Sequence, residues 1–209
     1  IMRFLISAAG TGGHVFPALE FSAECIKNNH EVFWMGTKTG LESRKVPEKN
    51  IQFLTIPMRG FRGKNLLNKC ISIFGLVASI GKTIIFLFQN KINFVVCFGG
   101  YISLPVGIAA ILCRKQLILH EQNAVMGTSN KLLAPFAKII FLGTPLAMVL
   151  QKNTQLVGNP IKRINKHQDM VPPKSDELKI YVTGGSLGSE FINQEYSYCL
   201  KLIKYSNND

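Results

Sequence analysis

The sequence predicts an α/β protein: a doubly wound parallel sheet, followed by the first strand, loop and helix of a second domain of the same kind. Short apolar runs alternate with stretches of helical periodicity along most of the chain. Of 209 residues, 47% are hydrophobic and 17% charged, a composition that supports a sizeable core and disfavours global disorder. A polar segment then interrupts the alternation, after which one further strand–glycine loop–helix pattern begins.

The first domain is expected to span residues 1–157. Apolar runs predict strands at residues 3–9, 31–36, 51–56, 94–98, 116–120, 138–142 and 156–157, and the first helix is expected at residues 17–29. In an open parallel sheet, ligands bind at the carboxyl ends of the strands.

The polar segment, residues 158–177, contains Pro172 and Pro173 and is predicted to be a linker. Residues 178–182 are then predicted to form a strand, residues 183–189 a loop, and a helix to begin near Glu190. One strand–helix unit cannot bury its own apolar face. Residues 178–209 are therefore predicted to be the start of a truncated second domain.

A long apolar segment at residues 70–88 contains Lys82 as its one charge. It is long enough for a transmembrane helix, but Gly75 and Gly81 interrupt it and a crossing would split the sheet. A membrane-surface or partly buried helical hairpin and an ordinary core helix are both kept as interpretations. In the first, the apolar contacts come from Ile73, Phe74, Val77, Ile84 and Phe88, and lipid phosphates meet Arg59, Arg62, Lys64 and Lys69.

The net charge is +12, and Glu121 is the one acidic residue between Glu48 and Asp169. This distribution favours an anionic partner, namely a membrane surface, a phosphorylated substrate or nucleic acid, over a merely solvated lysine-rich face. No nucleic-acid-binding motif accompanies the charge, so no nucleic-acid partner is expected. The five cysteines are scattered without metal-ligand spacing, so no metal site is expected.

Glycine-rich or polar loops follow several predicted strands, at residues 9–14, 99–101, 120–123 and 183–189. Glycine lets a backbone approach a ligand closely, and a helix amino terminus behind it favours negative charge. The spacing excludes a dinucleotide-binding fingerprint and a nucleoside-triphosphate P-loop. Two glycine loops in two separate domains indicate ligands held between twin domains.

Five ordered motifs, GTGGHVFPAL (10–19), GGYISLP (99–105), HEQN (120–123), VGNP (157–160) and TGGSLGS (183–189), resemble those of the MurG family of bacterial glycosyltransferases. RGFRGK (59–64) is similar to that family's basic stretch. The resemblance covers residues 2–193. It implies a two-domain GT-B fold and inverting transfer of N-acetylglucosamine from UDP-N-acetylglucosamine to undecaprenyl-pyrophosphoryl-N-acetylmuramyl pentapeptide, the lipid I to lipid II step of peptidoglycan synthesis.

The resemblance further implies a peripheral location at the cytoplasmic face of the bacterial inner membrane, with an anionic membrane surface as partner and no cofactor. By motif, the implied donor-binding residues are Thr11, Gly12, Gly13, Asn123, Lys162, Arg163 and Ser186. The family commonly has an arginine where this sequence has Lys162, and lysine lacks the bidentate fork of arginine.

The implied catalytic residues are His14 and Glu121. His14 is a candidate catalytic or acceptor-contacting residue, with a helix-capping role as the alternative. Glu121 is either a general base or a carboxylate that orients Gln122 or Asn123. Tyr101 and Gly100 are implied to line the acceptor site, with a packed aromatic as the alternative for Tyr101.

The family's later donor-binding motifs have no counterpart in these 209 residues, so this chain alone is expected to be inactive. Two other functions remain open: a related glycolipid synthase that uses diacylglycerol, and a non-catalytic remnant that binds membrane and acceptor.

Overall fold

The structure, a computed structural model, describes residues 1–58, 66–147, 153–162, 181–184 and 189–206. The chain divides into two compact units, Ile1–Lys162 and Arg163–Asp209. This division falls inside the predicted linker, while the boundaries at residues 157 and 177 stay predictions. Each unit is described by itself.

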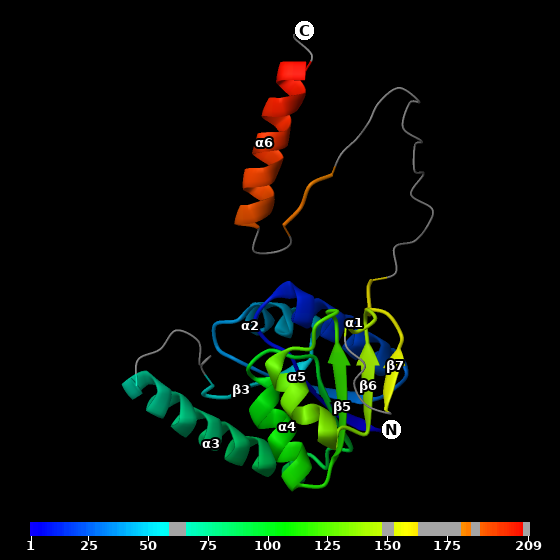
Figure 1. The fold of residues 1–209 in the computed structure, drawn as a ribbon. Helices are drawn as coiled ribbons and strands as arrows, with labels where there is room; N and C mark the ends of the chain where they lie inside the picture. The colour runs from blue at the N-terminus through cyan, green and yellow to red at the C-terminus, as the bar shows by residue number, and fades with distance from the viewer. Residues whose placement is uncertain (59–65, 148–152, 163–180, 185–188, 207–209) are drawn as a thin grey trace. The chain divides into compact units, whose positions relative to one another are not determined.

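The first unit is built on a seven-stranded parallel sheet in the order β3-β2-β1-β4-β5-β6-β7 (Figure 1). The predicted α/β, doubly wound architecture is therefore confirmed. The strands are β1 (Arg3–Ser7), β2 (Glu31–Gly36), β3 (Gln52–Thr55), β4 (Phe94–Cys97), β5 (Gln116–Glu121), β6 (Ile139–Leu142) and β7 (Thr154–Leu156).

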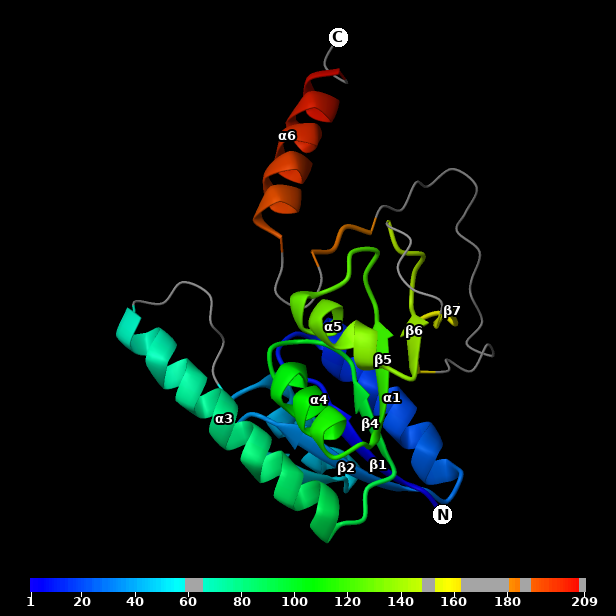
Figure 2. The same cartoon turned by 60° about the horizontal axis from the view of Figure 1, so that its bottom comes forward.

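Helices cover both faces of the sheet (Figure 2). One face carries α1 (Gly12–Lys27), α2 (Leu41–Lys45) and the short helix η1 (Pro47–Lys49); the other carries α3 (Leu66–Gln89), α4 (Ser103–Leu112), α5 (Thr128–Leu133) and η2 (Ala134–Phe136). Because strand side chains alternate between faces, Phe4 and Ile6 of β1 pack in the core under α1, whereas Leu5 packs in the core under α3 and α4.

Helix α1 begins five residues earlier than predicted. Proline is common at the first position of a helix, yet Pro17 lies inside α1. The helix starts at Gly12 because Thr11 has the extended conformation of a capping residue and its carbonyl accepts hydrogen bonds from the amides of His14 and Val15, both at 3.2 Å. The first glycine loop is therefore partly the first turn of a helix.

Helix α3 is one continuous 24-residue helix, so the predicted hairpin is wrong. Gly75 does not break the helix; it permits a close approach, since a Cβ there would lie 2.5 Å from the Pro57 carbonyl oxygen. Towards the sheet, α3 places small hydroxyl side chains whose bonds return to its own backbone: Ser79 Oγ donates to Gly75 O at 2.6 Å and Thr83 Oγ1 to Ser79 O at 2.7 Å.

The side of α3 turned to solvent is apolar. We call it the outer face of α3; it consists of Ile73, Phe74, Val77, Ile85 and Phe88, each between 55% and 77% exposed. Ile84, predicted to belong to this set, is half-buried and packs against the core instead. By length and hydropathy alone, residues Ser72–Gln89 could cross a membrane. The basic residues 59–64 lie outside the described residues.

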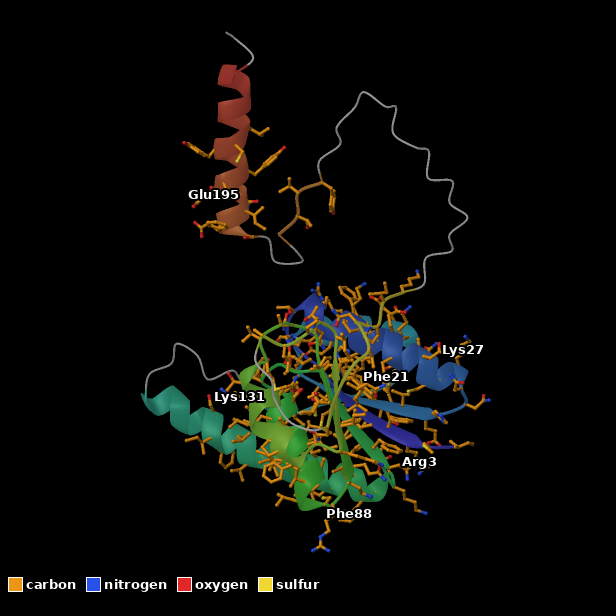
Figure 3. All side chains as sticks on the ribbon, turned by 45° about the vertical axis from the view of Figure 1, so that its right-hand side comes forward. Arg3, Phe21, Lys27, Phe88, Lys131 and Glu195 are labelled. Carbon is orange, nitrogen blue, oxygen red and sulfur yellow. The ribbon has the colours of Figure 1, made fainter. Side chains whose placement is uncertain are left out.

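In the second unit, α6 (Glu190–Ser206) begins where predicted, and Ser189 Oγ accepts the amide of Ile192 at 3.2 Å as a helix cap. Glu195 on α6 is labelled in Figure 3. Tyr181 and Val182, the described end of the predicted strand 178–182, are not in a strand. A strand needs a neighbour to pair with, and the rest of that prediction lies outside the described residues.

Candidate functional site

The site lies at the carboxyl ends of β1 and β4, where the strand order reverses and where ligands bind in doubly wound sheets. The loops after these two strands touch each other. A Cβ on Gly100 would lie 2.7 Å from the Ala9 carbonyl oxygen, and one on Gly99 would lie 2.9 Å from His14 Cδ2. Gly99 and Gly100 also have φ values of +96° and +79°, so glycine satisfies both the space and the backbone conformation.

The amino terminus of α1 lies at this switch point between β1 and β4, which we call the crevice. Thr11 caps the helix, and the amides of Gly12 and Gly13 precede the first internal hydrogen bond of the helix. No acidic side chain occupies the first turn. Free amides and the positive end of the helix dipole together favour an anion such as a diphosphate. Thr11, Gly12 and Gly13 lie at this helix end, and their contact with the donor stays a prediction.

His14 stands in the first turn of α1, half-buried against Gly99. Its Nδ1 lies 3.4 Å from Thr11 Oγ1, and no hydrogen bond joins its ring to a backbone amide among the described contacts, so the geometry does not favour the helix-capping alternative. Burial lowers the pKa of His14, and the negative charge of Glu121 offsets part of that shift. The imidazole is therefore neutral at neutral pH and able to accept a proton.

The Glu121 carboxylate, 2% exposed, organises the loop between β5 and α5. Its Oε1 accepts the backbone amide and side-chain Nδ2 of Asn123 at 3.2 and 3.0 Å, and its Oε2 accepts the Gly127 amide at 2.9 Å and Asn130 Nδ2 at 3.0 Å. Both oxygens of this carboxylate are occupied by four donors, which leaves little capacity for a substrate proton. This geometry favours the orienting role, directed at Asn123.

The other members of this loop anchor it to the sheet. Gln122 Nε2 donates to the Phe98 carbonyl oxygen at 3.0 Å, so Glu121 does not orient Gln122. The buried His120 ring stacks on Phe98 at 5.1 Å and its Nε2 lies 3.3 Å from Gly158 O. Within the HEQN motif, Asn123 alone is exposed and available to a ligand.

Comparison with known proteins places this site in a family. The model of the glycosyltransferase family 28 N-terminal domain matches residues 4–142. The chain belongs to glycosyltransferase family 28. The match spans the sheet from β1 to β6 and includes the loops after β1, β2, β4 and β5.

Curated relatives of this family 28 chain are named UDP-N-acetylglucosamine–N-acetylmuramyl-(pentapeptide) pyrophosphoryl-undecaprenol N-acetylglucosamine transferase. The protein of Marinobacter nauticus is 36% identical over 205 residues, covering 96% of this chain and 56% of the relative. That of Acidithiobacillus ferrooxidans is 38% identical over 193 residues, covering 90% and 53%. The resemblance to the MurG family is confirmed, and the chain spans about half the length of these relatives.

Solved structures agree with the family 28 fold. The crystal structure of Acinetobacter baumannii MurG matches with a TM-score of 0.68 at 32% identity, over 78% of this chain and 47% of that one. A glycotransferase of kitacinnamycin matches with a TM-score of 0.59 at 12% identity, over 79% and 53%, which shows a shared fold alone.

Two polar residues of the family 28 site were not identified in the sequence analysis. Asn130, fully buried on α5, donates from Nδ2 to His120 O as well as to Glu121, each at 3.0 Å. Glu42, fully buried on α2, accepts the Thr37 amide and hydroxyl at Oε1, at 3.0 and 2.7 Å, and the Gly10 amide at Oε2, at 3.3 Å. Glu42 therefore ties the first glycine loop to the loop after β2.

The remaining predicted site residues fall into three groups. Gly100 and the half-buried Tyr101 lie beside the crevice. Lys162 is exposed after β7, with no ion pair among the described contacts. Arg163 and Ser186 lie outside the described residues, so their predicted donor contacts stay predictions.

Proposed function

We propose that the protein to which this chain belongs transfers N-acetylglucosamine from UDP-N-acetylglucosamine to undecaprenyl-pyrophosphoryl-N-acetylmuramyl pentapeptide, the lipid I to lipid II step. The observation that carries the proposal is the crevice between β1 and β4, where the amino terminus of α1 and a neutral His14 lie against the loop of Gly99 and Gly100. Relatives that span these same residues carry that activity in their names.

In the proposed reaction, an acceptor hydroxyl attacks the anomeric carbon of the donor sugar while the bond to UDP breaks. His14 takes the hydroxyl proton, because burial lowers its pKa and so keeps the ring neutral before the reaction. The amides of Gly12 and Gly13 stabilise the negative charge that develops on the diphosphate. Glu121 fixes Asn123 at the edge of the crevice, where the amide contacts the donor. Arg163 and Ser186 supply further donor contacts, and no cofactor takes part.

The test is transfer of labelled N-acetylglucosamine by the full-length protein to lipid I, with diacylglycerol as the rival acceptor. Substitution His14→Ala is expected to lower kcat by about 10²–10⁴-fold, and His30→Ala, at the far end of α1, to leave it unchanged. Transfer to diacylglycerol in place of lipid I would refute the proposed acceptor. Unchanged kcat in His14→Ala would refute the proposed base. A protein of residues 1–209 alone is expected to show no turnover.

We further propose that the outer face of α3 rests on the anionic cytoplasmic surface of the inner membrane. Its five exposed apolar side chains lie on one side of a single helix. Each exposed aromatic ring that inserts contributes about 1.5–3 kcal/mol, so Phe74→Ser is expected to weaken binding to phosphatidylglycerol vesicles by about tenfold or more. Phe16→Ser, on α1 across the sheet, is the matched control; equal losses in both variants would refute the docking face.

A further inference from the structure

A cavity lies at the carboxyl ends of β2 and β3. Its volume is about 790 Å³, within the range of about 300–1,000 Å³ that is usual for ligand pockets. The loop after β2, the end of β3 and the segment after it, helix α3 and Tyr101 supply its walls: Thr37, Lys38, Thr39, Thr55, Ile56, Pro57, Met58, Ala78, Lys82 and Tyr101. No residue predicted as a donor contact lines it.

The polar groups of this cavity suit an anion. Lys82 Nζ donates to the Thr55 carbonyl oxygen at 2.6 Å, which fixes the ammonium at the cavity wall with two further N–H groups to donate. Lys38 brings a second ammonium, and no ion pair of Lys38 occurs among the described contacts. The Glu42 carboxylate contacts the lining residue Thr37, and both of its oxygens are already engaged by Thr37 and Gly10.

The apolar groups place the cavity next to the outer face of α3. Ala78 and Lys82 are one helical turn apart, so they lie on the same side of α3. Val77 and Gly81, their immediate neighbours in sequence, lie on the adjacent solvent side, and Val77 belongs to the outer face. A ligand with an anionic head and a hydrocarbon chain would place its head between the two lysines and its chain along the outer face of α3.

We propose that this cavity binds the pyrophosphoryl group of a polyprenyl lipid. The inference rests on the proposed function, because it takes the outer face of α3 to contact the membrane. A diphosphate carries enough charge and oxygen acceptors for two ammonium groups and the Thr39 hydroxyl. Tyr101, which follows Gly100 at the crevice and also lines this cavity, connects the two sites. The lipid head enters here, and the sugar attached to it extends past Tyr101 towards His14.

The test compares binding of the full chain to three kinds of phosphatidylcholine vesicle. The first has no added lipid, the second contains undecaprenyl pyrophosphate, and the third contains phosphatidylglycerol in the amount that gives the same charge as the second. We expect the wild-type chain to prefer the undecaprenyl pyrophosphate vesicles over the charge-matched ones. The double variant Lys38→Gln, Lys82→Gln is expected to lose that preference by about tenfold or more, with phosphatidylglycerol binding changed by less than about twofold. Circular dichroism and urea midpoints verify that the variant is folded.

Matched controls are Lys27→Gln and Lys131→Gln, exposed lysines of α1 and α5 that do not line the cavity and are labelled in Figure 3. The proposal is overturned if the double variant keeps the preference, or if a control variant loses as much. It is also overturned if soluble pyrophosphate binds the cavity while the vesicle preference is absent, since the site would then take free phosphate. Phe74→Ser tests membrane docking separately, so either proposal can fail while the other stands.

Discussion

The buried carboxylate of Glu42 gives the most direct test of how the first glycine loop is held. It accepts three hydrogen bonds, two from Thr37 and one from the Gly10 amide. In Glu42→Gln, the amide oxygen can replace one carboxylate oxygen, and the NH₂ group then faces at least one donor. A buried donor left without an acceptor costs about 1–3 kcal/mol, which is the expected loss in the free energy of unfolding.

Trp34, the one tryptophan of the chain, reports this unfolding. It is fully buried in β2 and its Nε1 donates to the Ala8 carbonyl oxygen at 3.2 Å, next to the glycine loop. Urea titration followed by tryptophan fluorescence therefore measures the domain that contains Glu42. For a domain of this size the loss corresponds to a fall in melting temperature of about 3–10 °C.

Glu48→Gln is the control, since Glu48 lies six residues away, is exposed and pairs with Lys45 at 3.0 Å. A surface ion pair of this kind contributes below about 1 kcal/mol, so this variant should unfold close to wild type. If Glu42→Gln and Glu48→Gln unfold within about 0.5 kcal/mol of each other, the three hydrogen bonds to Glu42 do not hold the loop and the reasoning is wrong.

Two further predictions concern the crevice. Gly99→Ala forces a Cβ against His14 at a φ of +96° and is expected to lower the free energy of unfolding in urea by about 1–3 kcal/mol. Gly13→Ala is the control and should be neutral or stabilising, because its Cβ would meet only Thr11 Oγ1 at 3.7 Å. A larger loss of stability in Gly13→Ala than in Gly99→Ala would contradict the geometry. Burial lowers the folded-state pKa of His14 and His120 below the usual 6.5. As pH falls through 6.5 the unfolded chain therefore takes up protons before the folded chain does, and the free energy of unfolding should decrease. Equal urea midpoints at pH 7.5 and pH 5.5 would contradict this pH dependence.

The sheet could be predicted from the sequence because its strands are short buried apolar runs. Glu31–Gly36 was predicted to the residue, and the other strands to within about two. The bounds of the helices were harder to predict where a residue type fits two different positions in a helix. Pro17 indicated a helix start but lies inside α1, because the cap at Thr11 decides the beginning. Gly75 indicated a break but serves the close approach of α3 to Pro57.

The site could be predicted in its loops and not in its contacts. The first glycine loop was identified from local sequence, since glycine next to a helix start has a local physical meaning. The roles of Thr11, Gly12, Gly13 and His14 within it were implied by the family resemblance and stay predictions. The hydrogen bond between Glu42 and Gly10 joins residues 32 positions apart. No local pattern marks such a pair, because it depends on two loops that only the finished sheet brings together.

The outer face of α3 also bears on the abundance of the protein in the cell. Folded chains normally hide contiguous apolar stripes, and chaperones and proteases recognise unfolded chains by that same feature. Helix α3 turns its hydroxyl groups inward and two phenylalanine rings outward. The correctly folded molecule therefore exposes apolar surface of the kind that an unfolded chain exposes. We therefore expect its lifetime in cells to depend on whether this helix is covered, with copies in excess of their docking surface degraded first.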